Sequence, residues 1–382
     1  MKKKICDRIK KAAANLLTLT VAVSLLALPV FAETETAEST AESGVADGGA
    51  PDGGMADGSY ADEAGWVNFM LICNEGMSSR GGNSGNTEMV VSLNRNTGRI
   101  RLMMFSWDTF VNYEEYDVPQ KLDMAYRNGG PEEAVKVFND NFNTDIDLFL
   151  SLNYLNLAAL IDNYGGVDVD VTRAERNALN SMVSSKKEDL QKQLEDHKLD
   201  QLAIDVLADE YYLQEFGPGT HLNGLQAVGY GWLQYDSVYN CCLREQDVIA
   251  NLFHHVGETL HETIVFYTNE SGKPDIDDGR RLINLDDIQP DDMDFLREEI
   301  DPIFDDSYNN LTDPDINSIT LALARVSYLA SRQGVELMDH MDYTVMPLEV
   351  KEPYQTVAGI KGHVIDFEAN SAAIHNFLYT EA

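Results

Sequence analysis

Basic residues are scarce in this chain of 382 residues: 28 Lys and Arg stand against 64 Asp and Glu, a formal net charge of −36. Such a negative field excludes nucleic acid as a partner, because its phosphates need a basic surface. A P-loop, a Rossmann glycine signature and a serine nucleophile motif are also lacking. The Cys and His spacings resemble no zinc site, so His254, His255 and His261 are interpreted as partly exposed polar side chains. An anionic ligand would therefore need a local cationic pocket or a metal ion.

The first 32 residues have the pattern of an export signal. Six basic residues between Lys2 and Lys11 precede an apolar stretch that runs from Ala12 to Ala32. We expect cleavage after Ala32 and an extracellular or cell-envelope location. A retained membrane anchor is the alternative, although Thr, Ser and Pro interrupt the apolar run and weaken it as a permanent span.

The rest of the chain divides into a linker and one large domain. Residues 33–65 are rich in Ala, Gly, Asp, Glu, Ser and Thr without apolar periodicity, so we expect a disordered acidic linker. Residues 66–382 are predicted to form a single domain. Two insertions are expected in it, a helical one at about residues 173–216 and an acidic one at about residues 270–312.

Short apolar strands alternate with helical patterns along this domain, with late strands expected at residues 343–348 and 363–367. This alternation predicts a layered α/β/α fold with a central mixed sheet flanked by helices. The segment Asp162–Val171 is the most informative, because a Gly-Gly pair allows a tight reversal before a strand of alternating Val and Asp. We expect this segment to enter a central strand of the sheet.

Three blocks of sequence point to a family. Residues 165–169 read Gly-Gly-Val-Asp-Val, and residues 222–230 read Leu-Asn-Gly-Leu-Gln-Ala-Val-Gly-Tyr. Residues 121–130 contain a Lys-x-x-x-Ala-Tyr motif followed by Gly-Gly. These blocks resemble the LytR–CpsA–Psr family. The resemblance implies transfer of a glycopolymer from a polyprenyl pyrophosphate carrier to peptidoglycan, near a membrane. Its partners would be a polyprenyl-linked glycopolymer or polyprenyl phosphate, and peptidoglycan.

The same resemblance implies a set of site residues. Asp108 and Arg244 would be catalytic, with Asp108 either holding Mg²⁺ together with Glu75 or activating the attacking sugar hydroxyl as a general base. A further aspartate of the family is replaced by Asn86, unless Glu88 compensates. The substrate-binding residues implied are Arg80, Lys121, Gln246, Trp107 and Trp232.

Arginine is missing from four positions where the family has it, namely Trp107, Trp232, Gln234 and Cys241. A pyrophosphate needs permanently charged, bidentate donors, and one lost charged contact in a transition state costs about 2.7–4 kcal/mol. Two functions therefore stay open: the transferase, or a relative that binds a polyprenyl lipid, a glycan or a protein partner without catalysis. The two tryptophans either stack on a sugar or prenyl chain or fill the space that a lost site left.

Three cysteines remain after the expected signal cleavage. In the family alignment Cys73 ends the first site strand and Cys241 replaces a pocket arginine, with Cys242 beside it. In an oxidising compartment we expect a disulfide from Cys73 to Cys241 or Cys242 that closes the floor of the pocket. Three buried thiols are the alternative.

Overall fold

The computed structural model of the chain describes residues 65–74, 85–94, 96–114, 116–197, 211–267, 294–305, 307–333, 337–348 and 350–380. The expected signal sequence, nearly all of the expected linker, and much of both expected insertions lie outside these ranges. Within the described ranges, no helix combines the length and the apolar character that crossing a membrane requires.

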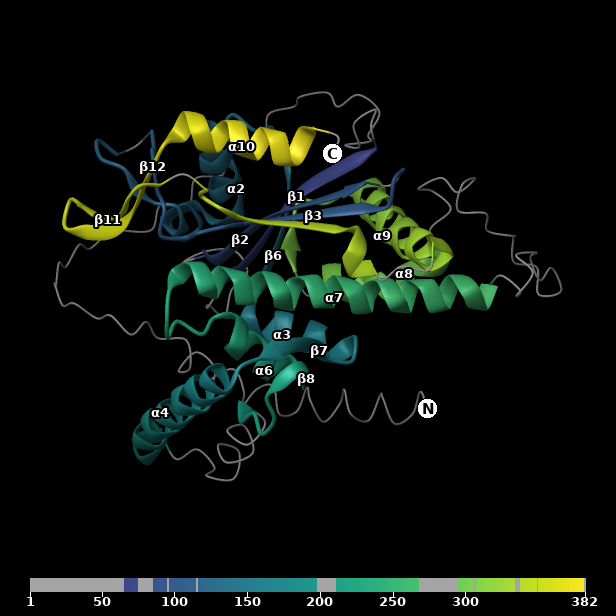
Figure 1. Cartoon of the computed structure of the whole chain (residues 1–382), viewed down its shortest axis with the longest axis horizontal. Helices are drawn as coiled ribbons and strands as arrows, with labels where there is room; N and C mark the ends of the chain where they lie inside the picture. Colours follow the sequence, from purple (N-terminus) through teal and green to yellow (C-terminus); the bar gives the residue numbers. More distant parts are fainter. Residues whose placement is uncertain are drawn as a thin grey trace.

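Six strands form the central sheet in the order β10–β3–β2–β1–β6–β9 (Figure 1). Their bounds are β1 Trp66–Asn74, β2 Gly85–Asn94, β3 Arg99–Phe105, β6 Leu148–Asn153, β9 Tyr308–Asn309 and β10 Met341–Met346. Strand β2 is antiparallel to β1 and β3, whereas β6 is parallel to β1 and β10 is parallel to β3. The carboxyl ends of β1, β3, β6 and β10 therefore meet at one edge of a mixed sheet.

Helices cover both faces of this sheet. One face packs against α3 (Tyr154–Asn163), α7 (Val238–Tyr267), α8 (Asp294–Asp305) and α9 (Asp313–Gln333), and the other against α2 (Asp123–Phe142) and α10 (Phe367–Tyr379). Leu71 and Val91 belong to the first apolar layer, and their neighbours Met70 and Val90 belong to the second. Because successive side chains of a strand point to opposite faces, such strands must be apolar throughout. The predicted layered α/β/α fold is confirmed.

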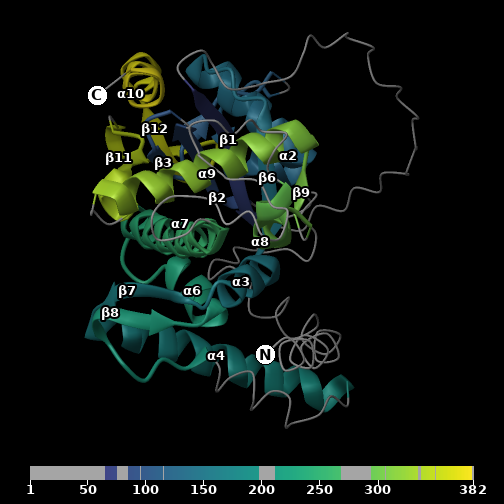
Figure 2. The ribbon, with the colours of Figure 1, turned by 90° about the vertical axis from the view of Figure 1, so that its right-hand side faces the viewer.

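The Val-Asp strand does not join the central sheet, so that part of the prediction was wrong. Strand β7 (Val167–Val171) pairs with β8 (Gly217–Leu222) in a separate antiparallel hairpin. Figure 2 shows this hairpin beyond α7, beside α6 (Gly224–Gly231) and α4 (Arg173–His197). The valines are buried and Asp168 and Asp170 are exposed. A strand covered on both faces cannot carry a row of aspartates, so the alternation itself argues for a hairpin with one solvated face.

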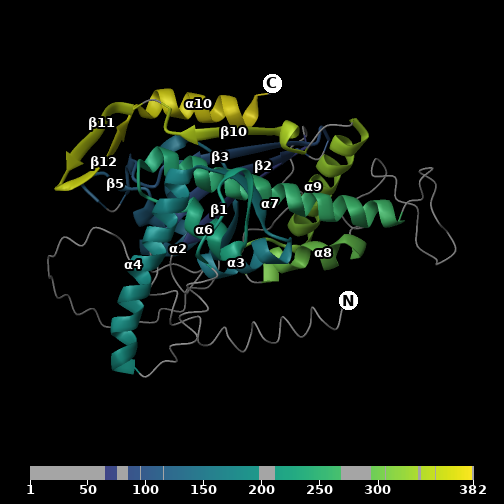
Figure 3. The same ribbon diagram turned by 60° about the horizontal axis from the view of Figure 1, so that its bottom comes forward.

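The carboxyl-terminal part of the chain returns to the sheet and adds a second hairpin. Strands β11 (Val350–Val357) and β12 (Ile360–Ile365) form it, and Figure 3 shows it beyond the end of β10, near β5 (Gln120–Lys121). A single parallel bridge joins His363 of β12 to Thr109, which follows β3. Strand β4 (Phe110–Val111) and the short helix η2 (Leu337–His340) complete the described elements. The sequence predicted strand structure near β12 but not β11.

Arg101 on β3 ties the two ends of the domain together. Its guanidinium donates to the carbonyl oxygens of Leu378 and Thr380 at 2.8 and 2.7 Å. The same group lies 3.9 Å above the ring of Trp66, the first residue of β1. One buried cation thus contacts both the first strand and the end of the last helix.

Candidate functional site

Asp108 lies just beyond the carboxyl end of β3 and is 1 % exposed. Ser106 Oγ donates to its Oδ1 at 2.6 Å, and the Tyr354 hydroxyl donates to its Oδ2. His363 Nε2 lies 3.9 Å from Oδ1. Burial, followed by the hydrogen bond to Asp108, raises the pKa of Tyr354, so this phenol stays a proton donor. Asp108 is therefore a buried carboxylate that accepts a hydrogen bond from the hydroxyl of an exposed tyrosine.

Trp107 precedes Asp108 in the chain and contacts Lys121 of β5. The Lys121 Nζ atom is 5.1 Å from the centre of the Trp107 ring, within the range of a cation–π interaction. The Trp107 indole nitrogen is buried and has no hydrogen-bond partner in the described part of the chain. The structure thus groups two of the predicted substrate-binding residues.

Trp232 belongs to a different polar group, on the α7 side of the sheet. Its ring stacks on Tyr154 at 3.8 Å, and its indole nitrogen donates to Thr87 Oγ1 at 3.0 Å. Thr87 in turn donates to Glu245 Oε2 at 3.1 Å, and Cys241 Sγ lies 3.5 Å from Glu245 Oε1. Thr87 and Cys241, both neutral, therefore contact the buried carboxylate of Glu245, and Trp232 reaches it through Thr87. Glu245 was not predicted from the sequence, although it lies between the motif residues Arg244 and Gln246.

Arg244 is held by acidic groups of the fold. It forms a bidentate pair with Asp236 at 2.9 and 3.1 Å, donates to the Leu233 carbonyl, and lies 3.6 Å from Glu175. Burial opposes ionisation of Asp236, but the hydrogen bonds from Arg244 prevail and lower the pKa of Asp236 to about 2. The guanidinium is thus directed at Asp236 and Leu233 rather than at Asp108.

Gln246 also makes its contacts within the fold. Its Nε2 donates to the carbonyl oxygens of Leu102 on β3 and Thr344 on β10, at 2.9 and 2.8 Å. These two bonds fasten α7 to the edge of the sheet. In this arrangement the side-chain amide positions α7, and its donors are occupied.

The predicted Mg²⁺ site can be compared with the structure only in part. Glu75 and Arg80 lie outside the described residues. In the described part of the chain, no group of three or more His, Cys, Asp or Glu is arranged to hold a metal ion. Both carboxylate oxygens of Asp108 already accept hydrogen bonds. The described residues by themselves therefore do not make up a divalent-metal site.

Glu88 is a buried acid with no cationic partner in the described part of the chain. The side chain is 2 % exposed, and neither carboxylate oxygen has a hydrogen-bond partner among the described residues. Burial, and then the charge of Asp123, raise the pKa of Glu88 well above its usual value. Glu88 pairs with Ile72 and Phe105 in the sheet register and so faces α2, on the opposite side from Thr87 and Glu245.

The expected disulfide is absent, so that prediction was wrong. Cys73, Cys241 and Cys242 are all free and buried. Their environments differ: Cys241 faces the Gly231 carbonyl and Glu245, whereas Cys242 faces Ser106. Burial, and then the charge of Glu245, raise the pKa of each thiol. The alternative of three buried thiols is the one that the structure bears out.

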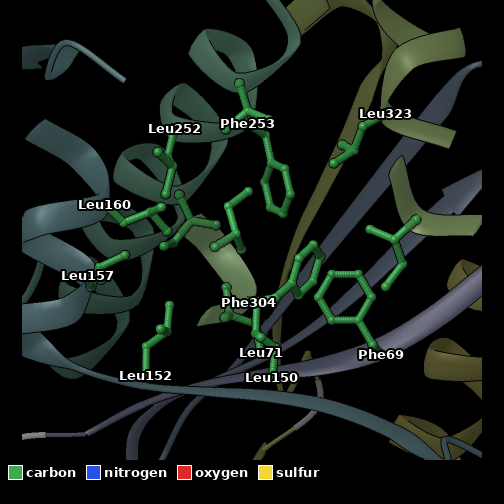
Figure 4. A pocket seen from close by; sticks show the side chains of 14 residues that line it. Phe69, Leu71, Leu150, Leu152, Leu157, Leu160, Leu252, Phe253, Phe304 and Leu323 are labelled. Atoms are coloured by element: carbon green, nitrogen blue, oxygen red, sulfur yellow. The ribbon is translucent and has the colours of Figure 1, made fainter. Parts of the chain in front are cut away.

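An apolar pocket opens on the α7 side of the sheet, between β1, β6 and the helices α3, α7, α8 and α9 (Figure 4). It contains about 490 Å³ of empty space, part of it open to solvent. Its lining is entirely aliphatic or phenylalanine, as Leu71, Leu152, Leu160, Phe253 and Phe304 illustrate in Figure 4. Such a lining suits an alkyl or prenyl chain and no charged group.

The fold and these sites define an α/β/α domain with a buried acidic centre at the carboxyl edge of its parallel strands and an apolar pocket on one face. The LytR_cpsA_psr family model matches residues 37–259, more than half of the chain, and the chain belongs to this family. The β11–β12 hairpin lies outside the matched residues. A comparison with curated proteins finds no match.

Solved structures share the fold at low sequence identity. Crystalline TagV of B. subtilis is 12 % identical with a TM-score of 0.52, covering 84 % of this chain and all of its own. Protein gbs0355 of Streptococcus agalactiae is 15 % identical with a TM-score of 0.54, covering 85 % of this chain and 91 % of its own. TagT bound to LIIa-WTA is 12 % identical with a TM-score of 0.52, covering 85 % of this chain and 95 % of its own. TagT is also a B. subtilis protein.

Proposed function

We propose that this protein transfers a glycopolymer from a polyprenyl pyrophosphate carrier to peptidoglycan, outside the cytoplasmic membrane. Family membership supports the reaction class, and the expected export signal supports the location. The observation that carries the proposal is the wholly apolar lining of the pocket on the α7 side of the sheet. A prenyl tail buried there gains roughly 25 cal/mol for each Å² of apolar surface removed from water.

Asp108 is the residue that we assign to the chemical step. The hydroxyl oxygen of the acceptor sugar attacks the phosphorus atom that carries the glycopolymer, and its proton passes to Asp108. The bond from that phosphorus to the bridging oxygen breaks, and polyprenyl phosphate leaves with the bonding electrons. A buried carboxylate with a hydrogen-bonded hydroxyl already on Oδ2 is arranged for such a proton transfer.

Charge on the phosphates is the demanding part of this reaction. Arg244 is neutralised by Asp236, and neutral side chains occupy four arginine positions of the family. Lys121 and Arg80 are the remaining cations that we assign to the phosphates. Mg²⁺ held through Glu75 remains a prediction of the family resemblance, and chelation by EDTA tests it.

The test is turnover of a synthetic polyprenyl pyrophosphate-linked saccharide by the purified protein with a peptidoglycan fragment and Mg²⁺. We expect release of polyprenyl phosphate, and a loss of about 10²–10⁴-fold in kcat in Asp108→Asn. Asp145→Asn is the matched control, because Asp145 also accepts a tyrosine hydrogen bond, from Tyr379 at 2.7 Å. Prenyl pyrophosphate binding without any turnover would contradict the transferase and leave a binding protein.

A further inference from the structure

The β11–β12 hairpin supplies a wall of the Asp108 site from outside the residues that match the family. The backbone N–H of His363 donates to the Asp108 carbonyl at 3.0 Å. A Cβ atom added to Gly362 would lie 2.4 Å from the same carbonyl oxygen, so only glycine allows this approach. The contact fixes the hairpin against Asp108 and brings Tyr354 of the facing strand over the carboxylate.

Tyr354 is an exposed residue whose hydroxyl reaches a buried carboxylate. The residue is 50 % exposed, although its hydroxyl donates to Oδ2 of a carboxylate that is itself 1 % exposed. Its ring packs on His363 with centroids 4.5 Å apart, which fixes the side chain from one side. Ser106 occupies Oδ1 from within the fold. Among these contacts, the Tyr354 hydroxyl is the donor that comes from the solvent side.

A general base needs the hydroxyl of its substrate at hydrogen-bond distance from one carboxylate oxygen. The Tyr354 hydroxyl has this relation to Asp108 and is the same kind of donor. Exchanging one hydroxyl for another keeps the carboxylate hydrogen-bonded, so the exchange leaves no buried polar atom unsatisfied. An exposed aromatic ring beside the exchange point offers a flat surface to a sugar.

We propose that Tyr354 marks the acceptor subsite: a saccharide hydroxyl displaces the Tyr354 hydroxyl from Asp108 Oδ2, and the sugar ring packs against the exposed Tyr354 face. His363 positions Tyr354. The choice of a saccharide as ligand rests on the proposed function, whereas the exchange at Asp108 rests on the contacts of the hairpin.

The experiment measures binding of a peptidoglycan disaccharide, N-acetylglucosaminyl–N-acetylmuramic acid, by ligand-observed NMR without any pyrophosphate donor. In Tyr354→Phe the ring stays but the competing hydroxyl is gone, so we expect the Kd to fall by up to about tenfold. In Tyr354→Ala the ring is lost as well, so we expect the Kd to rise above that of Tyr354→Phe by about tenfold or more. A residue that only stabilises the fold would weaken binding in both variants or in neither.

Tyr379→Phe is the matched control. Tyr379 also donates to an aspartate, Asp145, at 2.7 Å, and its ring also packs on a histidine, His375, at 5.3 Å. This trio belongs to α10 and its surroundings, so the disaccharide Kd should stay unchanged.

Three results would overturn the inference: a wild-type protein that does not bind the disaccharide, equal Kd values in the two Tyr354 variants, or weaker binding in Tyr354→Phe. Because no donor is present, a protein that fails to transfer glycopolymer still gives a decisive binding result. A protein that transfers normally as Tyr354→Ala would overturn the acceptor subsite and leave the proposed function standing.

Discussion

Replacing Glu88 should change how the stability of this protein depends on pH. The carboxyl is buried, has no hydrogen-bond partner among the described residues, and has a raised pKa in the folded state. Between its ordinary pKa of 4.5 and the higher folded value, the unfolded chain releases a proton that the folded chain keeps. The stability that this proton provides is complete below pH 4.5 and is lost as the pH rises, by up to about 1.4 kcal/mol per pH unit.

Glu88→Gln removes this titration. A buried amide adds a penalty of about 1–3 kcal/mol, but that penalty does not depend on pH. The free energy of unfolding of Glu88→Gln, relative to wild type, should therefore rise as the pH increases above 4.5 in urea titrations. In Glu88→Met the free energy of unfolding should change with pH in the same way as in Glu88→Gln. It should be higher at every pH, because no polar group stays buried. Glu215→Gln, at an exposed position, is the control. Parallel pH profiles for wild type and Glu88→Gln would refute the reasoning.

Three further predictions address other described contacts. Arg244→Ala removes the bidentate bonds to Asp236, and we expect a loss of about 1.5–3 kcal/mol in the free energy of unfolding by urea titration, because Asp236 itself stays exposed to solvent. A loss below about 0.5 kcal/mol would contradict the pairing. In Leu160→Trp the larger side chain fills the apolar pocket, so the Kd for farnesyl pyrophosphate, measured by calorimetry, should rise at least tenfold. Leu348→Trp, at an exposed position, is the control and should leave this Kd unchanged. The three buried cysteines should not react with a thiol reagent in the native protein, because they are buried and their raised pKa values suppress the thiolate. All three should react after denaturation. Rapid reaction of the native protein would contradict their burial.

The strands β1, β2, β3 and β6 were predictable because each carries a run of apolar residues, whereas β9 was not predicted. The run Val67–Cys73 indicated β1, and the structure extends it by one residue at each end. The same logic, applied fully, would have excluded Asp168 and Asp170 from a central strand. Strand β11 escaped prediction because Val350–Val357 carries charged residues and a proline instead of an apolar run.

The sequence predicted only those site residues that lie close together along the chain. Asp108, Trp107 and Lys121 lie within a few residues of β3 or β5, so a motif comparison finds them together. Tyr354 is 246 residues from Asp108, and only tertiary packing brings its hydroxyl to the carboxylate. Arg244 pairs with Asp236, which lies only eight residues earlier, so this ion pair could have been predicted from the sequence.

The hydrogen bonds of Arg101 to Leu378 and Thr380 can form only late in folding. The guanidinium bonds to carbonyl oxygens 277 and 279 residues further along, and the neighbouring edge strand β10 also comes from the last fifth of the chain. A chain that emerges from its amino-terminal end cannot close this contact until nearly all of it is available. Ending the chain at residue 259, within α7, where the family match stops, would leave β3 with an unpaired, aggregation-prone edge and Arg101 without its two carbonyl acceptors. In this protein, the residues that match the family therefore depend on the carboxyl-terminal segment for the partners of β3 and Arg101.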